Sequence, residues 1–148
     1  MMGPPEFPEA PTPTWEQFCA DYQDYFFDGS RPEVWRSFII EHAGEAVGHI
    51  NYQIDAQCSF AELDIWMRDS SCCGHGWGSA ALCILCDQVR ATLGIREFIL
   101  RPSARNARAI KSYERAGFER HAMSDAQMQE RYGPGEYRDT VVMQRIME

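Results

Sequence analysis

The sequence lacks a run of about eighteen consecutive apolar residues, the length that a membrane-spanning helix requires. Its first residues also lack the basic and then apolar pattern of a secretion signal. A P-loop has a lysine and then a serine or threonine directly after its last glycine, whereas Gly78 is followed by Ser79 and Ala80, which excludes a P-loop here. We therefore expect a cytoplasmic protein that has no membrane among its partners.

Basic residues are fewer than acidic ones, 14 against 22, so the formal net charge is −8 at pH 7. Seven of the fourteen basic residues lie between positions 96 and 120. A nucleic-acid ligand requires a broad basic face, so we expect no nucleic acid as a partner. The overall acidity instead favours a cationic small molecule.

The six cysteines are spaced unlike those of a metal site or a redox motif. Cys83 and Cys86 fall inside an expected helix rather than at its start, and Cys72 is adjacent to Cys73. Adjacent cysteines do not suit a tetrahedral zinc site. We expect ordinary reduced cysteines and no metal.

The length of 148 residues suits one domain with a single sizeable core. Residues 1–13 hold five of the eight prolines and are expected to form an unstructured or extended arm before a domain over residues 14–148.

Hydrophobic periodicity predicts a mixed α/β fold with a central sheet. Helices are expected over residues 15–27 and 80–93, and strands over 34–40, 47–54, 60–67, 95–100, from 118 to about 123, and 137–146. The turn over 42–45 would join the first two strands into a hairpin, and 132–135 would form a loop. A short helix is expected after Pro102, with Ser103 or Asn106 as its cap and Gly117 at its end.

The most informative stretch is Cys73–Ser79, a glycine-spaced turn between a strand and a helix. Alternate glycines let the backbone bend sharply and bring successive N–H groups close to a bound group. These donors precede a helix, whose N-terminus carries about half a positive charge, so the favoured ligand is a phosphate or pyrophosphate. A dinucleotide fingerprint fits poorly, because its acidic partner should end the next strand whereas Glu97 begins it. A glycine turn with no ligand remains an alternative.

Combined with a second motif downstream, this loop resembles the GNAT superfamily of N-acetyltransferases. The family's acetyl-CoA loop is Arg/Gln-x-x-Gly-x-Gly/Ala, and position 71, where Arg or Gln would stand, is Ser71. This departure removes a charged contact but keeps the backbone donors. The later family signature is complete here, in Asn106, Ala109, Tyr113, Gly117 and Phe118. The resemblance covers roughly residues 38 to 118.

The resemblance implies a GNAT-like mixed sheet flanked by helices, with acetyl-CoA as cosubstrate. Pantetheine would pair with the strand centred on residues 65–67, and a backbone N–H of that strand would bind the oxyanion. The implied cosubstrate-binding residues are Ile65, Trp66, Met67, Gly74, His75, Gly76, Trp77, Gly78, Ser79, Asn106 and Arg108. Arg105 and Arg108 would lie near the outer phosphates of CoA, whereas Arg115 and Arg120 are expected to be solvated.

One departure concerns the start of the fold. Family members generally open with a strand and a helix, where this chain has only the proline-rich arm. Either the first strand is missing, or the arm or another chain takes its position. An unpaired sheet edge would favour association, so a homodimer is among the expected partners.

Three residues are candidates for catalysis. Tyr113 matches the family tyrosine that protonates or hydrogen-bonds the leaving sulfur, and a core tyrosine is the alternative. Glu62 and Asp64 share one face of their strand because side chains alternate, and such a carboxylate can take up the amine proton directly or through water. Asp64 is the better candidate, because similar aminoglycoside 6′-N-acetyltransferases place a substrate-binding acid there. A surface carboxylate paired with Arg68 is its alternative.

Those enzymes carry a second acid where this chain has Arg101, which would repel a polycationic ring. His49 and His75 are not assigned as catalysts. We expect an acetyl-CoA-dependent N-acetyltransferase acting on the primary amine of a small molecule, with an aminoglycoside-like antibiotic as one candidate. A peptide or protein N-acetyltransferase and a catalytically silent acyl-CoA-binding module are the alternatives. A cleft lined by acids and closed by the 132–137 loop would favour the small molecule.

Overall fold

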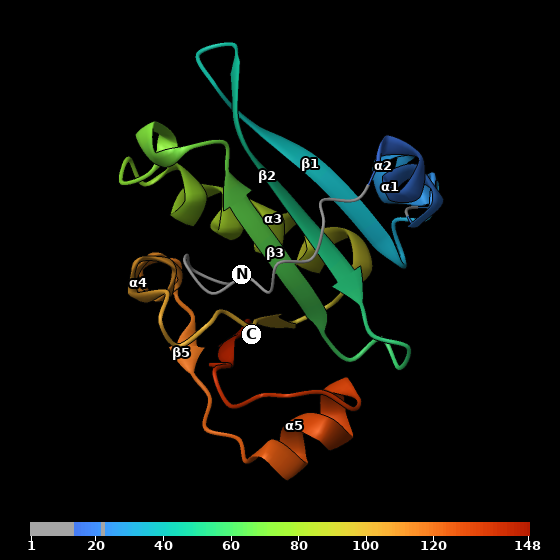
Figure 1. Ribbon diagram of the computed structural model, residues 1–148, viewed down its shortest axis with the longest axis vertical. Helices are drawn as coiled ribbons and strands as arrows, with labels where there is room; N and C mark the ends of the chain where they lie inside the picture. Colours follow the sequence, from blue (N-terminus) through green and yellow to red (C-terminus); the bar gives the residue numbers. More distant parts are fainter. Residues whose placement is uncertain (1–13, 22) are drawn as a thin grey trace.

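A computed structural model describes residues 14–21 and 23–148 (Figure 1). The expected arm over residues 1–13, and with it the question of a first strand, lies outside this part of the chain. No helix in the described part is long and apolar enough to cross a membrane.

One mixed sheet forms the centre of the molecule, as the sequence predicts. Its strands follow the order β1-β2-β3-β4-β6-β5, and β3 and β4 are the parallel neighbours whereas the other neighbours are antiparallel. The strands are β1 (Trp35–His42), β2 (Glu45–Ile54), β3 (Ala61–Met67), β4 (Glu97–Leu100), β5 (Glu119–Arg120) and β6 (Met143–Ile146). The prediction of a mixed α/β fold is confirmed.

The helices flank this sheet. They are α1 (Trp15–Asp21), α2 (Tyr25–Asp28), a 3-10 turn (Ser70–Cys72), α3 (Trp77–Leu93), α4 (Ala107–Arg115) and α5 (Asp125–Tyr132). In Figure 1, α1 and α2 lie beside β1, whereas α4 and α5 lie toward the opposite edge. Helix α3 begins three residues before the predicted start, so the end of the glycine loop forms its first turn.

Two hydrophobic clusters stabilise the sheet from its two faces. The main cluster joins the strands to α3 and α4 and includes Leu82, Phe98 and Phe118. A smaller cluster joins β4 to α5 and includes Ile99 and Met128. Phe98 and Ile99 belong to different clusters because neighbouring side chains of a strand point to opposite faces.

Three predicted elements are wrong in extent. The helix expected over 15–27 is divided into α1 and α2, and Phe26 of α2 packs on Trp35 of β1 with ring centroids 4.6 Å apart. The strand expected from residue 118 is the two-residue strand β5. The strand expected over 137–146 is shorter, because β6 covers only its last four residues. The preceding residues instead follow the turn after β4, since the Ala104 N–H donates to the Asp139 carbonyl at 2.8 Å.

Helix α5 was not predicted. Its start nevertheless carries a capping box, in which Ser124 accepts from the Gln127 N–H and the Gln127 side chain accepts from the Ser124 N–H. This pattern of serine followed three residues later by glutamine is a sequence-level helix signal.

The core makes a direct stability prediction. Phe98 is fully buried, so we expect Phe98→Ala to lower the free energy of unfolding by about 3–5 kcal/mol, from lost burial and the cavity left behind. Guanidinium denaturation followed by circular dichroism measures this change. Ile84→Ala, on the exposed side of α3, is the control and should change it by less than about 0.5 kcal/mol. Equal effects of the two substitutions would contradict this assignment of the core.

Candidate active site

The candidate site is built where β3 and β4 separate. These strands pair at Ala61 with Phe98 and at Glu62 with Ile99, and β3 then continues without β4 beside it. Backbone N–H groups alternate between the two edges of a strand, and the Arg68 N–H donates to a β2 carbonyl at 2.9 Å. The N–H of Met67 therefore faces the gap.

A cavity of about 360 Å³ opens at this gap, between β3, the glycine loop, α3 and α4. Ten of the eleven predicted cosubstrate residues line it, which brings together segments that are up to about forty residues apart. The exception is His75. Its Nε2 lies 2.9 Å from the Ser71 carbonyl oxygen, and its ring stacks on Trp77 at 4.4 Å, so it contributes to the shape of the loop.

The glycine loop has the conformation that an anion site requires. Gly74 and Gly76 have φ values of 81° and 82°, in the left-handed region that favours glycine. The first turn of α3 follows, and its N–H groups have no partner within the helix. These donors and the helix dipole fit the phosphates of CoA.

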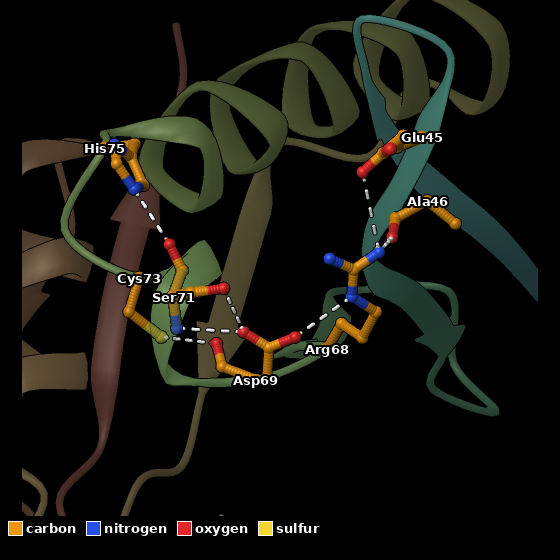
Figure 2. Close-up of polar contacts among 7 residues, drawn as sticks. All are labelled: Glu45, Ala46, Arg68, Asp69, Ser71, Cys73 and His75. Atoms are coloured by element: carbon orange, nitrogen blue, oxygen red, sulfur yellow. Dashed lines mark hydrogen bonds and ion pairs between the residues drawn. The ribbon is translucent and has the colours of Figure 1, made fainter.

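Polar contacts hold the loop in this shape (Figure 2). Asp69 accepts the Ser71 N–H at 2.9 Å and the Ser71 hydroxyl at 2.5 Å, and it forms an ion pair with Arg68 at 3.0 Å. Hydrogen bonds from Ser71 and then Arg68 lower the pKa of Asp69 to about 2. Arg68 also donates to the Ala46 carbonyl at 2.8 Å, which ties the loop to the β1–β2 hairpin. The alternative pairing of Arg68 with Asp64 is not observed.

Sequence reasoning missed Asp69, although an aspartate two residues before Ser71 is a common capping pattern.

Helix α4 closes the other side of the cavity. Asn106 caps it by accepting the Ala109 N–H at 3.1 Å, and Asn106 also lines the cavity. Arg108, Ser112 and Arg115 line the same wall, since positions separated by four and seven residues share a helix face. Arg115 was expected to be solvated, and its spacing from Arg108 is the pattern that could have identified it.

Arg105 lies elsewhere than expected. Its side chain forms an ion pair with Asp139 at 3.0 Å, and it does not line the cavity. A contact between α3 and α4 completes the wall, because the Ser79 hydroxyl donates to the Ser112 carbonyl at 2.9 Å.

A second cavity, of about 400 Å³, involves the opposite face of the sheet. The strand register aligns Ser37, Asn51 and Asp64 in one row across β1, β2 and β3. Asp64 and Glu62 both line this cavity, so the predicted shared face is present. Asp64 accepts the Ile65 N–H at 2.9 Å.

Tyr113 lines both cavities. Its side chain is buried, and burial raises its pKa above the usual value, with a further contribution from the negative charge of Asp64. The hydroxyl is therefore protonated at neutral pH.

Arg101 follows β4 and reaches Glu62 on the neighbouring strand. The Arg101 Nε donates to Glu62 at 2.6 Å, and the guanidinium lies 4.5 Å from the centre of the Tyr132 ring. Tyr132 thus packs against Arg101. None of residues 132–137 lines the second cavity, whereas Thr140 does, so the expected closure by the 132–137 loop is not observed.

His49 lies beside Asp64 in the sheet. Its ring stacks on Trp66 with centroids 4.1 Å apart, and its buried Nδ1 has no hydrogen-bond partner among the described residues. Burial lowers the pKa of His49, against the opposing effect of the Asp64 charge, so the ring is neutral at pH 7.

Across the described residues, no group of three or more His, Cys, Asp or Glu side chains is arranged to hold a metal ion.

The sequence matches the family model of an acetyltransferase (GNAT) domain over residues 2–119. The chain belongs to the GNAT acetyltransferase family. This membership confirms the resemblance drawn from the glycine loop and the Asn106–Phe118 motif. No curated protein sequence matches the chain.

Solved structures of acetyltransferases share its fold at low sequence identity. An aminoglycoside acetyltransferase, AAC(6')-Ib, in complex with coenzyme A and kanamycin is 20% identical, with a TM-score of 0.63 over 86% of this chain and 76% of that one. Spermidine N-acetyltransferase from Vibrio cholerae in complex with CoA and spermine is 18% identical, with a TM-score of 0.68 over 93% and 78%. A ribosomal L7/L12 alpha-N-protein acetyltransferase is 23% identical, with a TM-score of 0.64 over 78% and 72%.

A substitution of Asp69 tests whether its hydrogen bonds order the glycine loop. Asp69→Ala removes the acceptor that orders the loop, so we expect the Kd for CoA to rise about tenfold. This is the effect expected when the conformational entropy of roughly one more residue is lost on binding. Isothermal titration calorimetry measures the Kd. Asp87→Ala, which removes an equal charge from an exposed position on α3, should leave it unchanged. If both variants bind CoA as the parent chain does, Asp69 does not organise the loop.

Proposed function

We propose that this GNAT protein transfers the acetyl group of acetyl-CoA to the primary amine of a small molecule. The observation that carries the proposal is the position of Tyr113, which lines both the cavity beside the glycine loop and the cavity that contains Asp64. One side chain thus contacts the space for a thioester and the space for an amine. Similar folds hold CoA together with kanamycin or with spermine, which supports a small amine as acceptor.

The first cavity suits acetyl-CoA in three respects. The N–H groups of the glycine loop and of the first turn of α3 would bind the phosphates. Arg108 and Arg115, on the cavity wall, add positive charge for the same groups. The N–H of Met67 faces the gap beside β3 and would donate to the acetyl oxygen as it becomes an oxyanion, an interaction that typically stabilises a transition state by several kcal/mol.

The second cavity suits the amine. A primary amine with a pKa of about 10.4 requires about 4.6 kcal/mol to lose its proton at pH 7. Asp64 lines the cavity and acts electrostatically on Tyr113, so a carboxylate lies close to the reacting position. Asp64 would hold the ammonium and pass one proton to solvent, directly or through water.

The bonds and protons of the acetyl transfer then balance without any further group. The amine nitrogen forms a bond to the thioester carbon, and the bond from that carbon to sulfur breaks. Of the two protons that the ammonium loses, one leaves through Asp64, and the other replaces the proton that Tyr113 gives to the thiolate. Burial keeps Tyr113 protonated for this role.

The dimensions of the second cavity favour a small acceptor over a folded protein. A volume of about 400 Å³ lies within the range of small-molecule sites. An amine bound in this cavity would lie against Tyr113, which is one of its lining residues.

Removal of the Tyr113 hydroxyl tests the proposal. We expect Tyr113→Phe to lower kcat by about a hundredfold or more, because the leaving thiolate loses its acid. Its Kd for CoA should remain that of the parent chain. Free thiol released from acetyl-CoA, measured across a set of small amines and short peptides, reports the activity.

Two further variants complete this experiment. Asp64→Asn should reduce kcat/KM for the amine while CoA binding is retained. Tyr137→Phe removes a tyrosine hydroxyl from the smaller cluster, outside both cavities, and should retain full activity. A parent chain that binds CoA yet releases no thiol with any acceptor would be a silent acyl-CoA-binding module, and turnover of peptides alone would assign the protein acceptor instead.

A further inference from the structure

The charges that line the second cavity do not cancel. Two carboxylates, Glu62 and Asp64, and one guanidinium, Arg101, are its charged lining residues. His49 beside them is neutral at pH 7, and Tyr113 is protonated. One negative charge is therefore left for a ligand to balance.

This remaining charge belongs to Asp64, because Glu62 is already paired. Both Nε and an Nη of Arg101 lie 2.6 Å from the same Glu62 oxygen. The two side chains are only 26% and 30% exposed, so solvent screens their attraction less than that of a surface pair.

Aromatic contacts on the side away from Glu62 also restrain the Arg101 side chain. Its guanidinium lies over the Tyr132 ring of α5, and Tyr132 in turn meets Phe60 edge to face with ring centroids 6.0 Å apart. Arg131 lies over the same Phe60 ring at 4.7 Å and pairs with Glu97. Helix α5 thereby fixes the cation that neutralises Glu62.

The rest of the wall carries uncharged hydrogen-bonding groups. The amides of Asn51 and Gln53 and the hydroxyl of Thr140 line the cavity together with the ring of Trp35. Amides and hydroxyls recognise the same kinds of group on a ligand.

We propose that the acceptor carries a single positive charge, on the amine that is acetylated, and that the remainder of the molecule bears hydroxyl or amide groups. Asp64 balances the ammonium, and the paired Glu62 and Arg101 offer no site for a second one. A second ammonium would meet the mutually neutralised Glu62 and Arg101 and would lose hydration without a carboxylate partner. This proposal rests on the proposed function, because it concerns the acceptor of the same reaction.

A matched pair of amines tests it. 5-Amino-1-pentanol and 1,5-diaminopentane have equal length and differ by one hydroxyl in place of one ammonium. We expect the parent chain to show a kcat/KM for the amino alcohol at least about tenfold above that for the diamine. Spermidine and kanamycin, as larger polycations, should be poorer acceptors still.

Two substitutions should move this preference in opposite directions. Arg101→Met restores the charge of Glu62, so the ratio of amino alcohol to diamine should fall about tenfold or more. Glu62→Gln leaves the Arg101 cation unpaired, so the diamine should become a still poorer acceptor and the ratio should rise. Thermal unfolding of each variant shows whether it is folded, and the second variant tests the proposal if the first is not.

Arg96→Gln is the control for Arg101→Met, because it also removes one positive charge, at an exposed position outside the cavity. It should leave the ratio unchanged. The proposal is overturned if the parent chain prefers the diamine, spermidine or kanamycin, or if all three variants change the ratio alike. Bound CoA without thiol release from any amine would instead contradict the proposed function.

Discussion

The separation of β3 from β4 after two paired residues is the constraint on which both cavities depend. A parallel pair that continued to Met67 would occupy the backbone groups that now face the gap, and it would seal Tyr113 inside the main core. Because the strands diverge, a buried tyrosine on α4 contacts open space on both faces of the sheet. The gap thus joins a region suited to an anion with a region suited to a cation.

The anion region depends on contacts that lie outside the glycine motif. Gly74 and Gly76 permit the turn, but glycine alone leaves a chain free to adopt other conformations. Asp69 limits this freedom by accepting two hydrogen bonds from Ser71, and Arg68 links it to the β1–β2 hairpin. These contacts order the loop before a ligand arrives, which lowers the entropy lost on binding.

The cation region depends on the smaller core. Helix α5 packs on the face of β4 that carries Ile99, and Arg101, two residues further on, shares that face. The aromatic side chains beneath α5 hold the Arg101 guanidinium against Glu62. A helix that contributes no lining residue to either cavity therefore supports the ion pair that neutralises Glu62 in the second cavity.

Sequence patterns alone were enough to predict the fold class, the glycine loop, the capped helix from Asn106 and the shared face of Glu62 and Asp64. These features follow from local rules, namely left-handed glycines, capping side chains and the alternation of a strand. Three other features required the folded structure: Arg101 neutralises Glu62, 39 residues away, Arg105 pairs with Asp139, and Tyr113 lines both cavities. Local periodicity places a residue on a face of its own element, whereas the partner across that face depends on how distant segments pack.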